Sequence, residues 1–356
     1  MQHALESAVY ASYEHEPIKN LTLQYGLRFS NFRRLGKEDV FIYENGIPTS
    51  KEAIIDTTSY GAQEKIISFS APEPRFSANY VINNSNSVKL SYNRMQQYIH
   101  LVSNTTSATP IDIWTSSGKY IDPAQVDQIA LGYFKNFKEN AYEASIEGFY
   151  KKFDHLLDYK DGAELLLNET LETELLDGKG RAYGLELSVR KNKGAITGWV
   201  SYTLSPTERK VPGINNGKYY LANYDKTHDL SIAASWEINE KFNLSTNFTF
   251  ATGRPITYPE SRYVYDGITV PHYNNRNGSR TPKYHRMDIG LQYTPNRHPE
   301  KRWKSSWEIG AYNVYARKNA YSIFFRQNED NPLETEAVRL SIFGSVLPYL
   351  TYNFSF

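Results

Sequence analysis

Apolar and polar side chains alternate with a period of two along most of this chain. The pattern is clearest over residues 227–251, where two alternating arms flank the short polar turn Asn239-Glu240-Lys241. Successive side chains of a strand point to opposite faces, so this stretch predicts a β-hairpin with one apolar and one polar face. Its apolar positions are Leu230, Ile232, Ala234, Trp236 and Ile238 in the first arm and Phe242, Leu244, Thr246, Phe248 and Phe250 in the second.

The same hairpin pattern recurs through the whole sequence and predicts about 14 strands. Short polar turns alternate with connections that are mostly much longer, and the first turn is predicted at Glu16-Pro17. One long connection, residues 156–177, has a helical composition, and we expect a short helix there. The other predicted arms are 7–14 with 18–32, 75–82 with 88–98, 125–134 with 141–153, 181–190 with 195–204, 283–293 with 303–315, 321–325 with 337–343, and 346–356.

The alternation of short turns and long loops favours a membrane barrel over a soluble sheet protein. Compact soluble domains rarely contain so many loops longer than a dozen residues, whereas outer-membrane barrels have short turns at one end and long loops at the other. A membrane-spanning strand needs only about 10 residues, of which half face lipid. We therefore predict an all-β fold, an antiparallel up-and-down transmembrane β-barrel. A soluble all-β binding protein is the alternative from a different class.

The composition is typical of a membrane β-protein and gives no sign of a nucleic-acid-binding protein or an enzyme. The 29 Tyr and 17 Phe suit strands and the aromatic belts of membrane interfaces. A formal net charge of +1 gives no reason to expect a nucleic-acid partner. The eight His show no metal-ligand spacing, and no hydrolase, P-loop or dinucleotide motif is present, so we expect no enzyme activity, no metal and no cofactor. The first residues lack the pattern of a signal peptide.

Several blocks, in order along the chain, resemble the barrel of TonB-dependent outer-membrane receptors of the type common in Bacteroidetes. Each block is moderately specific, and their order makes the resemblance strong. The blocks are GKGRAYGLELSVRKNKGAITGWVSYTLS (178–205), YDKTHDLSIAASWEI (224–238), FATGRPITYP (250–259), RTPKYHRMDIGLQY (280–293), WEIGAYNVYARKNAYSIFF (307–325) and LPYLTYNFSF (347–356).

The resemblance implies a plugged barrel of about 22 strands. Residues 1–356 would form one partial barrel domain that corresponds to its C-terminal part, without the plug. The implied function is uptake of a bulky nutrient such as a siderophore, cobalamin or glycan, with the TonB complex acting only through a plug that this sequence lacks. A passive, self-closed pore of about 14 strands is the alternative within the same compartment.

Candidate site residues fall into three groups. A loop rich in aromatic, amide and basic side chains would be external, and its predicted ligand contacts are Arg254, Tyr263, Tyr265, His272, Tyr273 and Arg276. Alternation places polar side chains on the lumen wall, including Trp199 and the predicted pair Arg286 and Asp288, with Glu308. The last strand ends on the alternating apolar series Leu350, Tyr352, Phe354 and Phe356.

The predicted partners follow from the barrel interpretation. They are outer-membrane lipids around the wall and the barrel-assembly machinery at the terminal apolar series, which resembles the signal that this machinery reads. A surface lipoprotein that caps the barrel remains an open alternative. The sequence leaves the ligand open among siderophore, cobalamin, glycan and peptide.

Overall fold

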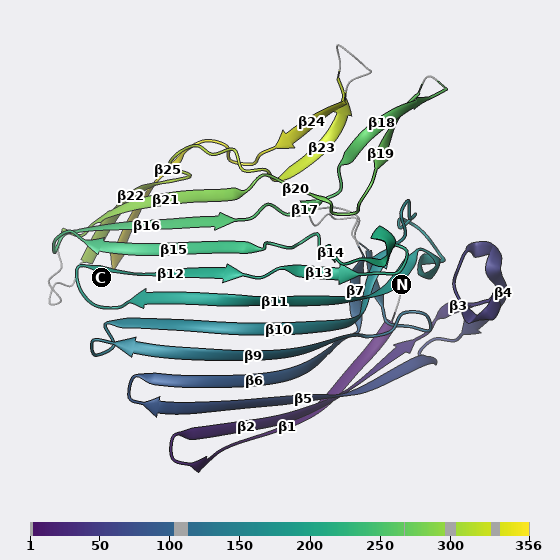
Figure 1. Cartoon of the computed structure of the whole chain (residues 1–356), viewed down its shortest axis with the longest axis horizontal. Coiled ribbons are helices and arrows are strands. Elements are labelled where there is room, and N and C mark those ends of the chain that lie inside the picture. The colour runs from purple at the N-terminus through teal and green to yellow at the C-terminus, as the bar shows by residue number, and fades with distance from the viewer. Residues whose placement is uncertain (1–2, 103–112, 267, 296–303, 329–334, 356) are drawn as a thin grey trace.

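The computed structural model describes residues 3–102, 113–266, 268–295, 304–328 and 335–355. It contains a 15-stranded antiparallel sheet that curves as a wall (Figure 1). All its strands except β13 and β14 lie on one path, in chain order. These are β1 (His3–Ile18), β2 (Leu21–Leu35), β5 (Lys65–Asn83), β6 (Asn86–Gln97), β9 (Ala124–Phe137), β10 (Tyr142–Tyr159), β11 (Leu175–Lys191), β12 (Ile196–Leu204), β15 (His228–Glu237), β16 (Phe242–Ala251), β21 (Tyr284–Tyr293), β22 (Lys304–Tyr312) and β25 (Leu347–Ser355).

The wall is an up-and-down sheet, as predicted, with its two end strands unjoined. Each strand on the path pairs with the next one along the chain, while β1 pairs with β2 alone and β25 with β22 alone among the described residues. The hairpin predicted over residues 227–251 is β15 and β16, in register Leu230↔Phe250 to Trp236↔Leu244.

Long connections and tight turns gather at opposite ends of the wall (Figure 1). Where the long connections are described, they contain their own hairpins and four short 3₁₀ turns, η1 to η4. No helix among the described residues is long and apolar enough to cross a membrane. The elements of this end are β3 (Glu38–Tyr43) with β4 (Ile54–Tyr60), β7 (Ile99–Val102) with β8 (Ile113–Ser116), β13 (Thr207–Lys210) with β14 (Tyr220–Leu221), β17 (Pro255–Ile256) with β20 (Ser279–Arg280), β18 (Pro259–Tyr265) with β19 (Ile268–Tyr273), β23 (Ser322–Gln327) with β24 (Thr335–Leu340), η1 (Glu44–Gly46), η2 (Lys51–Ala53), η3 (Leu171–Thr173) and η4 (Asn215–Gly217).

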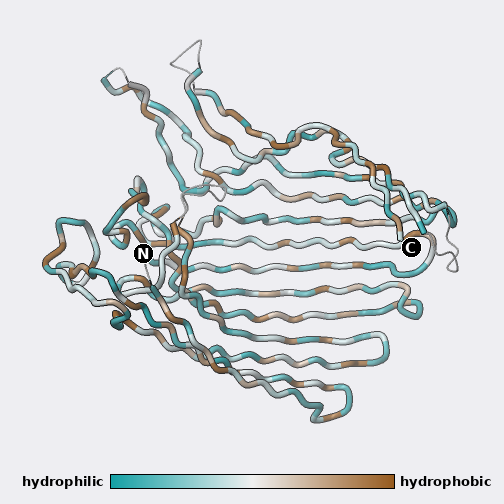
Figure 2. The backbone as a smooth tube through the Cα atoms, turned by 180° about the vertical axis from the view of Figure 1, so that it is seen from behind, coloured by the Kyte–Doolittle hydropathy of each residue, from teal (hydrophilic) through white to brown (hydrophobic). Residues whose placement is uncertain are grey.

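Cross-strand register gives the wall one apolar and one polar face. Residues paired across strands share a face, so each ladder row can be followed from strand to strand. Figure 2 shows the resulting alternation of hydrophilic and hydrophobic residues along each strand. One row reads Val189–Val200–Ile232–Phe248–Met287, and the neighbouring row reads Arg190–Trp199–Ala233–Asn247–Asp288. Trp199 therefore lies on the polar face, as its position in the alternation predicted.

Three local expectations were wrong. The first turn lies at Lys19-Asn20 instead of Glu16-Pro17, because Asn20 adopts positive φ (70°) and its N–H is bound by the Glu16 carboxylate at 2.6 Å. Pro17 has no N–H and lies inside β1, where the pairing register shifts. The two arms expected at 321–343 are not wall strands, because β23 and β24 pair with each other and, in the part of the chain that the structure describes, with no wall strand.

The third wrong expectation is the helix predicted within residues 156–177. The described structure there contains a single 3₁₀ turn, η3, between the end of β10 and the start of β11 at Leu175. The Asn168 side chain binds the Thr170 N–H at 2.8 Å and donates to the Glu164 carbonyl at 2.8 Å. Leu167 adopts positive φ (54°). Side-chain bonds of this kind compete with helical backbone bonds and explain the compact loop.

Candidate functional site

The predicted ligand contacts lie in the connection between β16 and β21, at the long-loop end of the wall. This connection, residues 252–283, has two parts. Its base is the short ladder of β17 with β20, and from this base rises the β18–β19 hairpin (Figure 1). Of the predicted ligand contacts, Arg254 and Arg276 lie at the base, whereas the tyrosines and His272 lie on the hairpin, so the two sets are described separately.

Arg276 is a buried anchor in the base, not a free ligand contact. Its guanidinium donates to Asp158 at 2.7 Å, to Asp161 at 2.5 Å and to the Tyr159 carbonyl at 2.7 Å, and its centre lies 4.5 Å from the Tyr159 ring centroid. The side chain is only 10% exposed. Burial acts to lower the pKa of Arg276, but the charge of Asp158 and the hydrogen bond to Asp161 raise it above its ordinary value.

Asp158 is the centre of this anchor. The Tyr220 hydroxyl donates to it at 2.6 Å, and Arg209 lies 3.5 Å away. Burial and the nearby Asp158 charge raise the pKa of Tyr220, so this phenol keeps its proton and its hydrogen bond. Asn215 completes the attachment by exchanging two hydrogen bonds with the backbone of Arg276, at 2.8 and 2.9 Å. The anchor thus joins β10, β14, η4 and the base of the 252–283 connection.

A second buried aspartate holds the other side of the base. Asp225 is 1% exposed. It accepts hydrogen bonds from Arg280 at 2.7 Å and from the N–H groups of Thr207 and Thr227 at 2.8 and 3.1 Å. Sequence reasoning missed both aspartates. The available signal was their position, since Asp158 ends an alternating strand and Asp225 stands two residues before Thr227 in a turn sequence.

The β18–β19 hairpin carries the other predicted aromatic contacts on two different faces. Register pairs Ser261 with His272, so Tyr263, Tyr265 and His272 share one face. Tyr273 lies on the opposite face, because strand alternation separates it from His272. Tyr263, Tyr265 and Tyr273 are all more than half exposed. A single flat ligand surface can therefore contact the first three residues together, but not all four.

Arg254 lies three residues after the end of β16, at the start of the 252–283 connection. Its side chain is exposed, and its carbonyl accepts a hydrogen bond from the Thr281 N–H at 2.8 Å. Gly253 beside it packs directly against the Thr281 carbonyl, where a Cβ would collide with backbone. The Gly253-Arg254-Pro255 sequence therefore shapes the base of the connection.

The predicted lumen-wall residues share the polar face of the sheet. Arg286 and Asp288 form the predicted ion pair, with nitrogen and oxygen 2.6 Å apart, and the second Asp288 oxygen accepts the Asn313 N–H at 2.9 Å. Glu308 accepts a hydrogen bond from the Tyr349 hydroxyl at 2.8 Å. A further charged group on this face is Arg28, which alternation also places there. It forms ion pairs with Glu6 at 3.0 Å and Glu73 at 2.5 Å that the sequence pattern did not predict.

The apolar series of the last strand lies on the apolar face. Leu350 pairs with Ile309, and Tyr352 pairs with Trp307, whose ring centroid is 4.5 Å away. Phe354 continues the same face of β25, and Phe356 lies outside the described residues. Among the residues that the structure describes, no group of three or more His, Cys, Asp or Glu side chains could hold a metal ion.

Comparisons with known proteins agree with this architecture. The model of the family "TonB dependent receptor-like, beta-barrel" matches residues 3–314. No curated protein matches the chain. Among solved structures, the ferric-catecholate import receptor Fiu of E. coli K12 in its closed form is 14% identical, with a TM-score of 0.60, over 99% of this chain and 44% of that one.

Two other solved structures are similar to the same extent. The unliganded ferric citrate transporter FecA is 14% identical with a TM-score of 0.58, over 99% of this chain and 45% of that one. The ferric preacinetobactin receptor BauA of Acinetobacter baumannii is 13% identical with a TM-score of 0.56, over 98% and 42%. The chain thus spans less than half of the length of these structures. Because the family model covers most of the chain, this protein belongs to the TonB-dependent receptor β-barrel family.

Proposed function

We propose that this chain forms wall and external loops of an outer-membrane receptor that takes up a bulky nutrient, with a ferric siderophore as the first candidate. The observation that carries the proposal is the exposed aromatic face of the β18–β19 hairpin. The ion pairs of Arg276 and Arg280 with the buried Asp158 and Asp225 hold this hairpin above a wall with one polar face. Solved receptors for ferric catecholate and ferric preacinetobactin have the same fold and support the choice of an iron chelate. Cobalamin and glycans are the other nutrients to test.

We infer that the wall corresponds to the C-terminal part of a larger barrel of the type common in Bacteroidetes. The outer edges of β1 and β25 have no partner strand among the described residues, and they support this proposal because an open sheet edge leaves backbone groups unsatisfied in lipid. A passive pore closed by these strands alone would need β1 to pair with β25. Energised transport would require a plug and the TonB complex, and a surface lipoprotein could cap the loops.

The apolar face of the wall would contact outer-membrane lipids. The last strand, with Leu350, Tyr352 and Phe354 on that face, would be read by the barrel-assembly machinery. Both proposals use the same alternation, since the residues that face lipid after assembly are those that the machinery would contact during assembly.

Uptake of a radioactive ferric siderophore tests the proposal in cells whose outer membrane contains this chain joined to the rest of a receptor, including a plug domain. We expect uptake that saturates and that stops when TonB is deleted. Conductance through purified protein in a planar bilayer tests the passive pore directly. TonB-independent uptake together with a steady conductance would contradict the receptor proposal. A panel of cobalamin and oligosaccharides, assayed in the same cells, identifies the nutrient.

A further inference from the structure

The wall contains a seam between β5 and β6 near its long-loop end. β5 and β6 pair with each other from Asn83↔Asn86, at their tight turn, as far as Arg75↔Asn93. From there to the long-loop end, β5 pairs only with β2 and β6 pairs only with β9 among the described residues. β5 stays paired with β2 up to Lys65, and β6 stays paired with β9 up to Gln97. The sheet is therefore split along its upper part while remaining continuous below.

Two prolines explain where the seam begins. The Val81 N–H donates to the carbonyl of Asn20, directly before the start of β2, so the odd-numbered residues of β5 direct their N–H groups toward β2. Even-numbered residues face β6, because successive residues of a strand direct their N–H groups to opposite neighbours. Pro72 and Pro74 are both even-numbered and have no N–H to donate. The ladder with β6 ends beside them.

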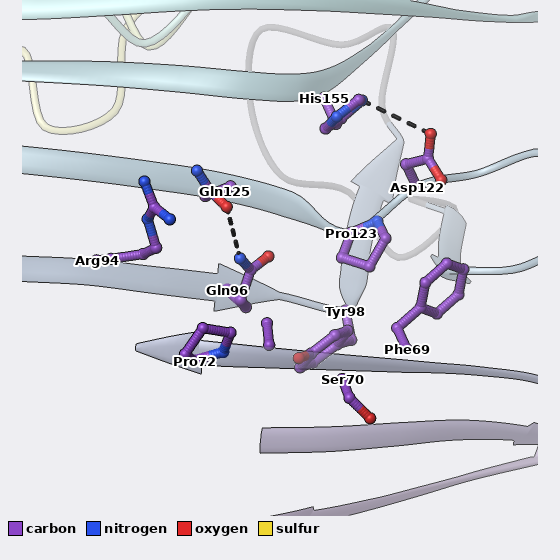
Figure 3. A pocket seen from close by; sticks show the side chains of 11 residues that line it. Phe69, Ser70, Pro72, Arg94, Gln96, Tyr98, Asp122, Pro123, Gln125 and His155 are labelled. Atoms are coloured by element: carbon purple, nitrogen blue, oxygen red, sulfur yellow. Dashed lines mark hydrogen bonds and ion pairs between the residues drawn. The ribbon is translucent and has the colours of Figure 1, made fainter. Parts of the chain in front are cut away.

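The seam forms a pocket of about 430 Å³, which falls in the range of small-molecule sites (Figure 3). Its β6–β9 side carries amide side chains, since Gln96 and Gln125 point toward one another from β6 and β9 and form a hydrogen bond of 2.9 Å. Its floor is Tyr98, which is 3% exposed and stacks on Phe32 with ring centroids 4.9 Å apart. The pocket is thus closed toward the polar face by an aromatic ring.

The ladder rows place this pocket just above the apolar band of the wall. On the apolar face, the row Leu90–Leu131 is followed by the row Tyr92–Ile129–Tyr150–Tyr183, and this by the charged row Arg94–Asp127–Lys152–Arg181–Glu208. An apolar band bordered by aromatic and then charged residues marks the boundary between lipid tails and headgroups. The seam opens at the height of the charged row, so it faces the headgroups of the leaflet on the long-loop side.

The chemistry of the lining favours an uncharged polyhydroxylated group. Arg94 is neutralised by a two-point contact with Asp127 at 2.8 and 3.1 Å. Asp122 and His155 lie 3.7 Å apart across the opening. No unpaired cation therefore remains among the lining residues to bind a phosphate. Amide and carboxylate groups around an aromatic floor instead suit the hydroxyl groups and the flat apolar face of a sugar ring.

We propose that this seam binds the saccharide headgroup of a membrane glycolipid, whose acyl chains lie on the apolar surface below. That surface runs down β5 and β6 from the pocket and includes the exposed side chains Tyr80 and Leu90. A ligand with a sugar head and apolar tails matches both parts at once. The site is separate from the proposed nutrient contacts on the β18–β19 hairpin, and its test requires no transport.

Native mass spectrometry of the purified protein tests the proposal. The probes are monogalactosyl diacylglycerol and phosphatidylcholine with identical acyl chains, added at equal concentration in detergent. We expect the wild-type protein to retain the galactolipid about fivefold more than phosphatidylcholine. The variant Gln96→Leu with Gln125→Leu removes the amides and should reduce this ratio to about one. The control Gln24→Leu, on the opposite face of β2, should keep the wild-type ratio.

Two further measurements test the seam itself and the source of the sugar. The variant Pro72→Ala with Pro74→Ala restores two N–H groups toward β6 and should lose the preference as the ladder lengthens. The glutamine variant carries the test if the proline variant does not assemble. Equal retention of both lipids by the wild type, or an unchanged ratio in the glutamine variant, would overturn the proposal. If free methyl galactoside binds as tightly as the galactolipid, the proposal that the bound sugar belongs to a membrane lipid is wrong.

Discussion

The Nη1 atom of Arg276 lies 2.7 Å from a carboxylate oxygen of Asp158, although 118 positions separate the two residues in sequence. Both side chains are at most 10% exposed. Removing one partner of a buried ion pair leaves an uncompensated charge and costs about 3–5 kcal/mol. Arg276, which the sequence predicted as a ligand contact, therefore holds the 252–283 connection against the end of β10.

The variant Arg276→Ala should loosen the base of this connection and leave the wall intact. We expect hydrogen exchange over residues 274–281 to accelerate by at least about 100-fold, since a cost of about 3–5 kcal/mol exceeds two factors of ten at 1.4 kcal/mol each. Arg262→Ala is the control, because Arg262 is an exposed residue on the projecting hairpin. Unchanged exchange in Arg276→Ala would show that Asn215 and Arg280 hold the base without the ion pair.

The two faces of the β18–β19 hairpin should contribute unequally to nutrient uptake. Tyr263 and Tyr265 share a face, and truncation of buried aromatic contacts commonly costs more than about 1 kcal/mol each. The variant Tyr263→Ala with Tyr265→Ala should therefore raise the half-saturating ligand concentration at least about tenfold. Tyr273→Ala, on the opposite face, should stay within about twofold. Equal effects of the two variants would indicate that the ligand surrounds the hairpin.

Docking of the β7–β8 hairpin should weaken below pH 6.5. His100 is 5% exposed and lies 3.0 Å from the Ser117 hydroxyl, and burial lowers its pKa to about 4. Between the ordinary value of 6.5 and about 4, the imidazole is protonated when the hairpin is open and neutral when it is docked. The free energy that favours the docked hairpin is therefore at its maximum above pH 6.5. It decreases as the pH falls, by up to about 3 kcal/mol at pH 4.

Hydrogen exchange of the Ser117 amide measures this effect, because its N–H donates to the Tyr98 carbonyl at 2.8 Å. Protection factors, corrected for the intrinsic pH dependence of exchange, should decline from pH 6.5 to pH 4. The variant His100→Gln cannot titrate in this range and should give a flat profile. A wild-type profile that is also flat would contradict a buried neutral imidazole.

The wall could be predicted from the sequence because its information is local. A strand with one face in lipid must alternate, and the alternation over residues 227–251 gave both the strands and the faces of β15 and β16 correctly. The same reasoning placed Arg286 and Asp288 on one face and predicted their ion pair. These statements need only the period of two and the spacing of residues within one strand.

The long-loop end could not be predicted in the same way. The Arg276 contact joins segments that are far apart in sequence, and no local pattern identifies Asp158 as its partner. The division of the hairpin tyrosines depends on a register shift between Pro259 and Ser261, where β18 is irregular. The seam at Pro72 requires knowledge of which neighbour each N–H faces, and this emerges only once β2 and β6 are placed.

Asp288 should stabilise the wall more through its backbone contact than through its ion pair. Arg286 is 43% exposed, and such partly exposed pairs contribute about 1 kcal/mol or less. Asp288→Asn keeps an oxygen for the Asn313 N–H and should lower the thermal midpoint of the assembled protein only slightly. Asp288→Ala leaves that buried N–H unpaired, at a cost of about 1–3 kcal/mol, and should lower it more. Equal losses in both variants would assign the main effect to the charge.

Tyr352 should determine how much protein reaches the outer membrane. It packs against Trp307 on the apolar face of β25, and an aromatic pair of this kind contributes about 0.5–1.5 kcal/mol beyond burial. We expect Tyr352→Ala to reduce the heat-modifiable, membrane-inserted fraction several-fold, while Tyr352→Phe and the polar-face control Asn353→Ala stay near wild type. The thermal midpoint of the inserted fraction separates two causes. A lower yield with an unchanged midpoint indicates an assembly signal, whereas loss of both indicates the Trp307 contact, and a wild-type yield would contradict either role.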